Sequence, residues 1–174
     1  MTTWKIDPAH SEVQFKVKHL MITSVTGGFA KFEGTVQSAS DDFSDASISF
    51  EADVESISTQ NADRDKHLQA PDFFDAAQFP KVRFVSKEVK KIDDENYKVI
   101  GDLTIRDHTK PVELTVEYGG TQKDPWGQVK AGFELSGKIN RKEFGLTFHA
   151  TTDNGGLLLG DEVKLLASVQ IVKQ

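Results

Sequence analysis

Residues 97–106, Tyr-Lys-Val-Ile-Gly-Asp-Leu-Thr-Ile-Arg, carry the pattern that decides the fold. One set of alternate positions is apolar or small: Tyr97, Val99, Gly101, Leu103 and Ile105. The positions between them are mostly polar. Alternation with a period of two is typical of a β-strand that buries one face and exposes the other. The stretch therefore predicts a strand in a sheet with one wet face.

The same alternation recurs along most of the chain, at about 12–19, 30–36, 46–54, 82–92, 112–118, 129–139 and 163–171. Val89 and Ile92 fall out of step, which indicates a slip or bulge. We expect about eight strands, and one-sided alternation favours antiparallel pairing. Long strands in nearly sequential order favour closure into a barrel, with a two-sheet sandwich as the alternative. The fold predicted for residues 1–174 is all-β and a single domain.

Two segments interrupt the alternation. Residues 58–80 contain a short helix, predicted over Arg64–Gln69 with Asp63 as its cap and Pro71 after its end. This helix would lie between the third and fourth strands. Residues 141–161 are rich in glycine. Both segments are long enough to act as lids or plugs.

Composition excludes several classes of function. The net charge is −6 and no run of Lys or Arg exceeds two residues, which argues against nucleic acid and against electrostatic attachment to an anionic membrane. No cysteine is present, which excludes disulfides and thiolate chemistry. No apolar run approaches the roughly 20 residues that span a bilayer, so we expect no integral membrane protein. Without a leader segment a cytoplasmic location is expected, and a periplasmic one if the chain is a processed form.

The inward face of the predicted barrel is apolar, which suits an extended hydrocarbon guest. Isoprenoid and fatty acyl chains fit the residues equally well. Small residues such as Gly101 and Ala131 would leave room for the guest, unless they accommodate Phe rings from neighbouring strands in a filled core. The candidate ligand-binding residues are Phe15, Val17, His19, Phe32, Phe50, Phe74, Phe84, Gly101, Leu103, Leu114, Ala131, Phe133, Leu135, Phe148 and Leu165.

Catalytic and metal chemistry find little support. The histidines, His10, His19, His67, His108 and His149, have no recognised ligand spacing. Asp7, His10 and Ser11 supply the residue types of a hydrolase, but they are more simply read as hydrogen-bonding groups that close the barrel end. Arg141 is expected to pair with an acidic residue, or else to reach a head group. We expect no catalytic residue, no metal and no cofactor.

Five short stretches, in this order, together resemble the YceI-like family: Trp4–Ser11 with Lys18-His19-Leu20, Asn61–Pro80, Gly101–Ile105, Asn140–Gly145 and Gly160–Val163. The resemblance implies a lipocalin-like barrel that sequesters or transports a polyisoprenoid, such as an isoprenoid quinone tail or a prenyl alcohol. An enzyme or stress-response factor acting on a small amphiphile is the alternative, and an interaction protein with a filled core is a third. The sequence leaves open whether the chain is a monomer or a homodimer.

Overall fold

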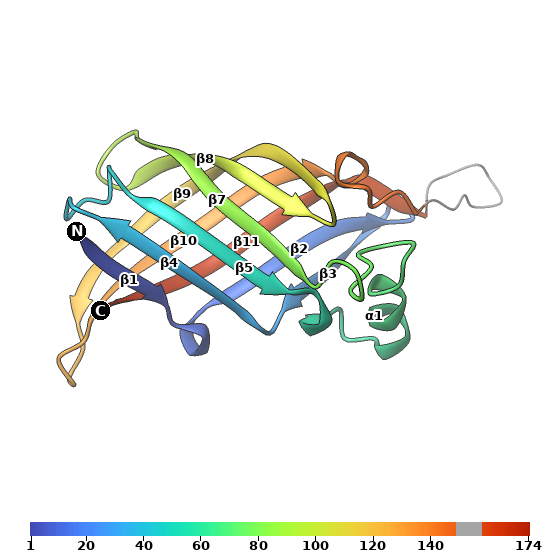
Figure 1. Cartoon of the computed structure of the whole chain (residues 1–174), viewed down its shortest axis with the longest axis horizontal. Helices are drawn as coiled ribbons and strands as arrows, with labels where there is room; N and C mark the ends of the chain where they lie inside the picture. Colours follow the sequence, from blue (N-terminus) through green and yellow to red (C-terminus); the bar gives the residue numbers. More distant parts are fainter. Residues whose placement is uncertain (149–157) are drawn as a thin grey trace.

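The chain folds as a long antiparallel β-barrel with a short helix at one end (Figure 1). The structure is a computed structural model, and it describes residues 1–148 and 158–174. Within these residues the first strands are β1 (Thr2–Ile6), β2 (Glu12–His19), β3 (Thr23–Phe29), β4 (Phe32–Ser38), β5 (Ser47–Asp53) and β6 (Ile57–Ser58). The later strands are β7 (Lys81–Lys91), β8 (Asn96–Ile105), β9 (His108–Lys123), β10 (Val129–Asn140) and β11 (Leu159–Lys173).

The barrel closes through eight of these strands, in the order β1-β4-β5-β7-β8-β9-β10-β11, with β11 pairing back onto β1. The remaining strands β2, β3 and β6 continue β1, β4 and β5 toward the other end of the barrel. Three long strands are thus each broken into two pieces. One break holds the 3-10 helix η1 (Pro8–His10), and another holds η2 (Val54–Ser56). The predicted eight-stranded antiparallel barrel is confirmed, although the alternation of the sequence did not predict β1 and β3.

Strand β8 pairs along its whole length with β7 and β9, so its apolar face lies inside the barrel. The predicted slip in β7 is a bulge. Its register against β8 shifts between Ser86 and Glu88, so Lys87 has no partner. The shift returns Val89 to the inward face, opposite Val99.

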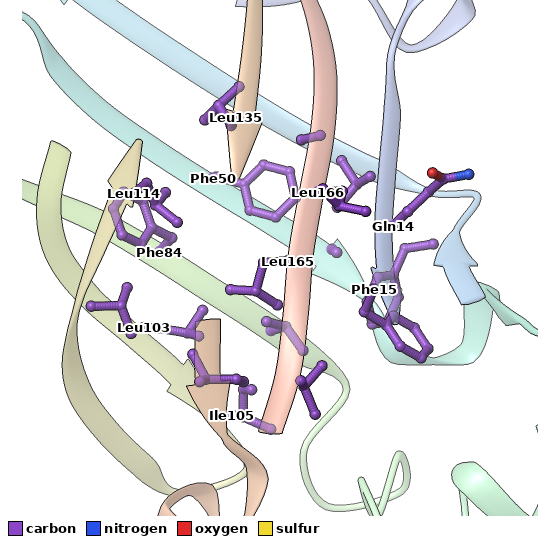
Figure 2. A pocket seen from close by; sticks show the side chains of 18 of the residues that line it. Gln14, Phe15, Phe50, Phe84, Leu103, Ile105, Leu114, Leu135, Leu165 and Leu166 are labelled. Atoms are coloured by element: carbon purple, nitrogen blue, oxygen red, sulfur yellow. The ribbon is translucent and has the colours of Figure 1, made fainter. Parts of the chain in front are cut away.

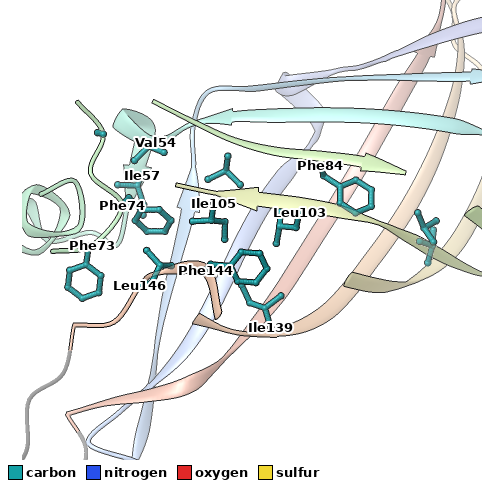
Figure 3. Packing of buried hydrophobic residues seen from close by; sticks show 14 of the residues in the cluster. Val54, Ile57, Phe73, Phe74, Phe84, Leu103, Ile105, Ile139, Phe144 and Leu146 are labelled. Carbon is teal, nitrogen blue, oxygen red and sulfur yellow. The ribbon is translucent and has the colours of Figure 1, made fainter. Parts of the chain in front are cut away.

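The helix α1 (Ala62–Leu68) lies between β6 and β7, the third and fourth long strands. Its cap is Asn61, not Asp63. The Asn61 side chain accepts a hydrogen bond from the Arg64 backbone N–H at 3.0 Å, so the helix begins earlier than the sequence predicted. The loop after α1 buries Phe73 and Phe74 against the barrel (Figure 3). Among the described residues no helix is long and apolar enough to cross a bilayer.

The two ends of the barrel differ. One end holds both chain termini, and the other holds α1, the β2–β3 turn and the 3-10 helix η3 (Arg141–Phe144) (Figure 1). The end with the termini is closed by a separate apolar cluster of Trp4, Phe43, Ala131 and Ile171. We call these the closed end and the open end.

Candidate functional site

The interior of the barrel holds an elongated cavity of about 470 Å³ (Figure 2). Strands from all round the barrel supply its wall, because their alternate side chains point inward. Most of the described lining residues are aliphatic or aromatic. The polar exceptions are Gln14, His19, Thr59, Arg64, His67, Ser136 and Arg141. Such a lining offers an extended apolar guest burial from water but few hydrogen bonds along its length.

Most of the candidate ligand-binding residues line this cavity. They are Phe15, Val17, His19, Phe50, Phe74, Phe84, Leu103, Leu114, Phe133, Leu135, Phe148 and Leu165. The structure therefore brings them together, and their contact with a ligand stays a prediction.

Phe32, Gly101 and Ala131 do not line the cavity. Phe32 packs on Phe50, with ring centroids 6.2 Å apart. Ala131 belongs to the apolar cluster that closes the barrel end. Gly101 is covered by a ring: a Cβ there would lie 2.5 Å from Phe84 Cζ and 2.5 Å from the Val85 carbonyl oxygen. Of the two alternatives for the small residues, Gly101 follows the second: it accommodates the Phe84 ring of the neighbouring strand.

The closed end is built by a loop that the sequence analysis did not single out. Phe43, between β4 and β5, is 5% exposed and its ring makes edge contacts with Trp4 at 5.2 Å and Phe133 at 5.3 Å. Phe43 also lines the cavity, and we call this part of the lining the cavity floor. The surrounding sequence, Ser38-Ala-Ser-Asp-Asp-Phe-Ser-Asp45, was the available signal, since one Phe among Ser and Asp in a turn needs a buried place.

Polar groups gather at the open end. Arg64 on α1 donates from Nε to the Thr59 hydroxyl and from Nη2 to the Thr59 carbonyl, both at 2.7 Å, which ties the helix to the end of β6. His67 hydrogen bonds Asp72 at 2.7 Å and packs edge-on against Phe148, with ring centroids 5.0 Å apart. The bond to His67 lowers the pKa of the Asp72 carboxyl. Arg64 thus holds the helix to the residue after β6, and His67 packs against the loop after η3.

Arg141 is 3% exposed and holds the loop after η3. It donates from Nε to the Gly160 carbonyl at 2.9 Å and from Nη1 to the carbonyls of Leu146 and Phe148, both at 2.7 Å. Its Nη2 lies 3.9 Å from Asp161 Oδ1. Burial lowers the pKa of the Arg141 guanidinium, and the nearby Asp161 charge opposes that effect. The geometry favours the structural pairing expected for this residue.

Arg106 has a similar role that the sequence did not reveal. Its Nη1 donates to the Phe73 carbonyl at 3.2 Å and to the Gly145 carbonyl at 3.0 Å. Its guanidinium also lies over the Phe79 ring, 5.6 Å from the centroid. One side chain in the β8–β9 turn therefore joins the loop after α1 to the loop after η3.

The residue types of a hydrolase do not form a triad. Asp7 lies 2.8 Å from His10 Nδ1, but Ser11 Oγ accepts a hydrogen bond from the Gln170 backbone N–H at 3.0 Å and lies 3.4 Å from its carbonyl. These groups tie the break between β1 and β2 to β11. Among the described residues, no three His, Asp or Glu side chains form a group that could hold a metal. His149 lies outside the described residues.

A second hollow runs outside the barrel between β9 and β10. Their pairing ends at Thr115 and Ser136, and beyond that point a groove of about 840 Å³ separates them. Pro111 in β9 supplies no backbone donor there, which accounts in part for the lost pairing. Phe144 of η3, 1% exposed, packs along this gap and fills it from one side.

The family model and the relatives that match this chain agree on one family. A family model described as the YceI-like domain matches residues 4–171. A UPF0312 protein of Staphylococcus epidermidis is 40% identical over 98% of this chain and 97% of its own length, and one of Staphylococcus aureus is 38% identical over the same shares.

Solved structures have the same fold. The Campylobacter jejuni YCEI protein has a TM-score of 0.75 at 34% identity, over 88% of this chain and 87% of its own. BcnA of Burkholderia cenocepacia has a TM-score of 0.82 at 24% identity, over 95% and 98%. A polyisoprenoid binding domain from Saccharophagus degradans has a TM-score of 0.68 at 12% identity, over 97% of each chain. At the identities of these last two structures, the similarity shows a shared fold and nothing more.

Proposed function

Because the chain belongs to the YceI-like family, we propose that its barrel binds and carries an extended apolar lipid, with a polyisoprenoid as the guest. The observation that carries the proposal is the apolar cavity inside the barrel, which Phe43 lines near the closed end and in which polar lining residues are few. The neighbour described as a polyisoprenoid binding domain supports the choice of guest.

In this proposal the hydrocarbon tail lies in the apolar cavity and points toward the closed end. Each buried methylene stabilises the complex by about 0.8 kcal/mol, so a long unbranched or methyl-branched chain gains more than a compact ring of the same polarity. The head group then stays near the open end, where Arg64, His67 and His19 lie. Oxygen atoms of an alcohol, quinone or phosphate find hydrogen-bond donors there.

The test is lipid extraction of the purified chain followed by mass spectrometry, for the parent and for Ala167→Phe. Ala167 is a small residue of β11 that lines the cavity. A ring there would occupy part of the guest's space, so we expect several-fold less bound lipid. Overpacking costs about 1–3 kcal/mol, so a melting curve accompanies the assay.

Ser168→Phe is the matched control. Ser168 follows Ala167 on the same strand and is exposed on the outer face. The substitution therefore adds the same ring outside the cavity. Equal lipid in the two folded variants would place the guest elsewhere. A parent that carries no lipid, and takes none up when a polyisoprenoid is supplied in detergent, would favour a filled core instead.

A further inference from the structure

The turn between β2 and β3 presents an apolar tip to solvent. Leu20, Met21 and Ile22 are 37%, 54% and 76% exposed. Leu20 and Met21 have φ of 54° and 60°, and the Ile22 N–H donates to the His19 carbonyl at 3.2 Å. A two-residue turn with two positive φ values favours Asn-Gly, and bulky side chains there are strained. Folding of the hairpin alone therefore does not account for this composition.

The tip stands beside residues that line the cavity. His19, which precedes it, lines the cavity, and so do Leu158 and, at the start of β11, Leu159. The Leu20 N–H donates to the Leu158 carbonyl at 2.8 Å. In Figure 1 the β2–β3 turn lies at the same end of the barrel as α1. A surface that touches the tip therefore lies close to this part of the cavity lining.

The outer face behind the tip carries a graded charge that the strand register creates. Farthest from the tip, the cross-strand row is Glu134, Ser168 and Glu12. The next row is uncharged, with Ser136, Leu166 and Gln14, which also border the cavity. The third row is entirely lysine, with Lys138, Lys164 and Lys16. Lys18 follows on β2, between this row and the tip, and the next outward pair of β10 and β11 is Asn140 with Glu162.

The lysine row is unfavourable for the isolated fold, because like charges directly opposite each other in a sheet repel. Lys138 has a partner in Glu162, at 3.4 Å. In the described part of the chain no carboxylate lies within ion-pair distance of Lys16 or Lys164. These residues come from distant parts of a chain whose net charge is −6. The basic surface is thus local, and no run of the sequence shows it.

We propose that the Leu20–Ile22 tip inserts into the surface of an anionic lipid bilayer, with Lys18 and the lysine row facing the lipid phosphates. Apolar groups at an interface enter about 5–10 Å, to the boundary of the acyl chains. At about 3.4 Å per residue, Lys18 stands roughly 7 Å behind Leu20 along the strand, which is the depth of the head groups. Lys16 stands a further 7 Å back, within about one Debye length of the surface.

This docking mode would bring the open end of the barrel, and the cavity-lining residues beside the tip, onto the membrane, the phase in which a long-chain lipid is dissolved. It extends the proposed function by naming where the guest enters and leaves. Binding to a vesicle needs only the outer surface, so the two proposals can fail separately.

The experiment is flotation of the full chain with vesicles of phosphatidylglycerol and phosphatidylcholine, and with vesicles of phosphatidylcholine alone. We expect binding to the anionic vesicles only, weakening as salt rises. Lys16→Gln with Lys164→Gln should lower the partition coefficient ~25-fold, about fivefold for each lysine. Ile22→Ser should lower it as well, and should leave the melting temperature unchanged because the side chain is exposed.

Matched controls lie at the closed end. Trp126 is 84% exposed in the β9–β10 turn, and Lys123 and Lys173 are exposed near the same end. Trp126→Ser and the pair Lys123→Gln with Lys173→Gln should bind vesicles as the parent does.

The docking proposal would be overturned if the variants at the tip and lysine row lost no more vesicle binding than the variants at the closed end. It would also be overturned by equal binding of the parent to both kinds of vesicle, or by no binding at all. Lipid content measured on the same variants without vesicles tests the cavity independently. A chain that floats but carries no lipid would keep the docking surface and remove the proposed function.

Discussion

Gly101 and Gly34 each lie beneath a large side chain from a neighbouring strand. A Cβ at Gly34 would come within 2.4 Å of Ile6 Cδ1, the far end of a flexible side chain. At Gly101 the near atoms are the Phe84 ring and the Val85 carbonyl oxygen, which belongs to the backbone. The two glycines thus let large residues lie flat against the barrel wall, and they differ in how easily their neighbours can move.

Gly101→Ala should therefore destabilise the protein more than Gly34→Ala. The new methyl at Gly101 needs a shift of the β7 backbone, and overpacking of this kind costs about 1–3 kcal/mol. At Gly34 a rotamer change of Ile6 relieves the contact. Chemical denaturation of the two variants measures the difference. Equal denaturation midpoints for the two variants would contradict this, because they would show that the β7 backbone yields to the new methyl as easily as the Ile6 side chain does.

The same residues mark how far sequence reasoning reaches. Alternation placed Gly101 on the inward face correctly, because the period of a strand is a local property. Whether an inward glycine leaves a void depends on the rotamer of Phe84, one strand away, and alternation carries no information about rotamers. Phe43 was missed for the related reason that a loop residue has no period.

Among the elements, the loop between β4 and β5 depends on carboxylates. Asp45 accepts hydrogen bonds from the Ser38 hydroxyl at 2.6 Å and from the Ala39 N–H at 2.9 Å. Asp42 accepts from the Ser44 N–H and from Lys91 Nζ, both at 3.0 Å. The Ser38 hydroxyl, followed by backbone donors, lowers the pKa of Asp45, and the Ser40 hydroxyl does most to lower that of Asp42. These bonds hold Phe43 over the cavity floor.

A carboxyl whose pKa falls on folding stabilises the native state above its unfolded pKa of about 3.9. That stabilisation is lost as the pH drops through the lower folded value. Asp45→Asn should be less stable than the parent near pH 6, since an amide N–H would face the Ala39 N–H. It should also lose less stability between pH 5 and pH 3.

Denaturant midpoints across that range give the measurement. Asp41→Asn is the control, because the Asp41 side chain makes no hydrogen bond within the described structure. A variant at position 45 whose pH profile matches those of both the parent and the control would contradict this role for the loop.

The elements also show which sequence signals were reliable. The strand of residues 97–105 was predicted from alternation, and a helix between the third and fourth strands from the loss of it. The breaks in the long strands at η1 and η2 were not predicted, because each lasts only a few residues and the apolar period resumes beyond it. The helix start was misplaced since both Asn61 and Asp63 are good caps, and only the backbone geometry selects Asn61.

At the scale of the whole molecule, the barrel encloses an apolar cavity and has an apolar cluster at its closed end. The family resemblance and the inward pattern were enough to predict an apolar interior. They could not predict where it stops, because the floor is assembled from Trp4, Phe43, Ala131 and Ile171, which are remote in sequence. The position of that floor sets the longest chain that fits.

Shortening the floor residue should therefore lengthen the preferred guest. Phe→Ala changes in cores cost about 3–5 kcal/mol, so Phe43→Leu is the milder choice. The loss of the ring extends the cavity toward Trp4, and additional carbons of a hydrocarbon chain can be buried there. We expect the lipids extracted from Phe43→Leu, after exposure to polyisoprenoids of mixed length, to shift toward longer chains by mass spectrometry.

Phe144→Leu provides the comparison that separates length selection from loss of stability. Phe144 is 1% exposed and packs at the open end, where it lines the outer groove and not the cavity. The same substitution there should lower the melting temperature, as at Phe43, while leaving the length distribution of the bound lipid as in the parent. If both variants shift toward longer chains, the distribution reflects a loosened barrel. If neither does, the guest does not reach Phe43, and the depth of the tube has no part in choosing it.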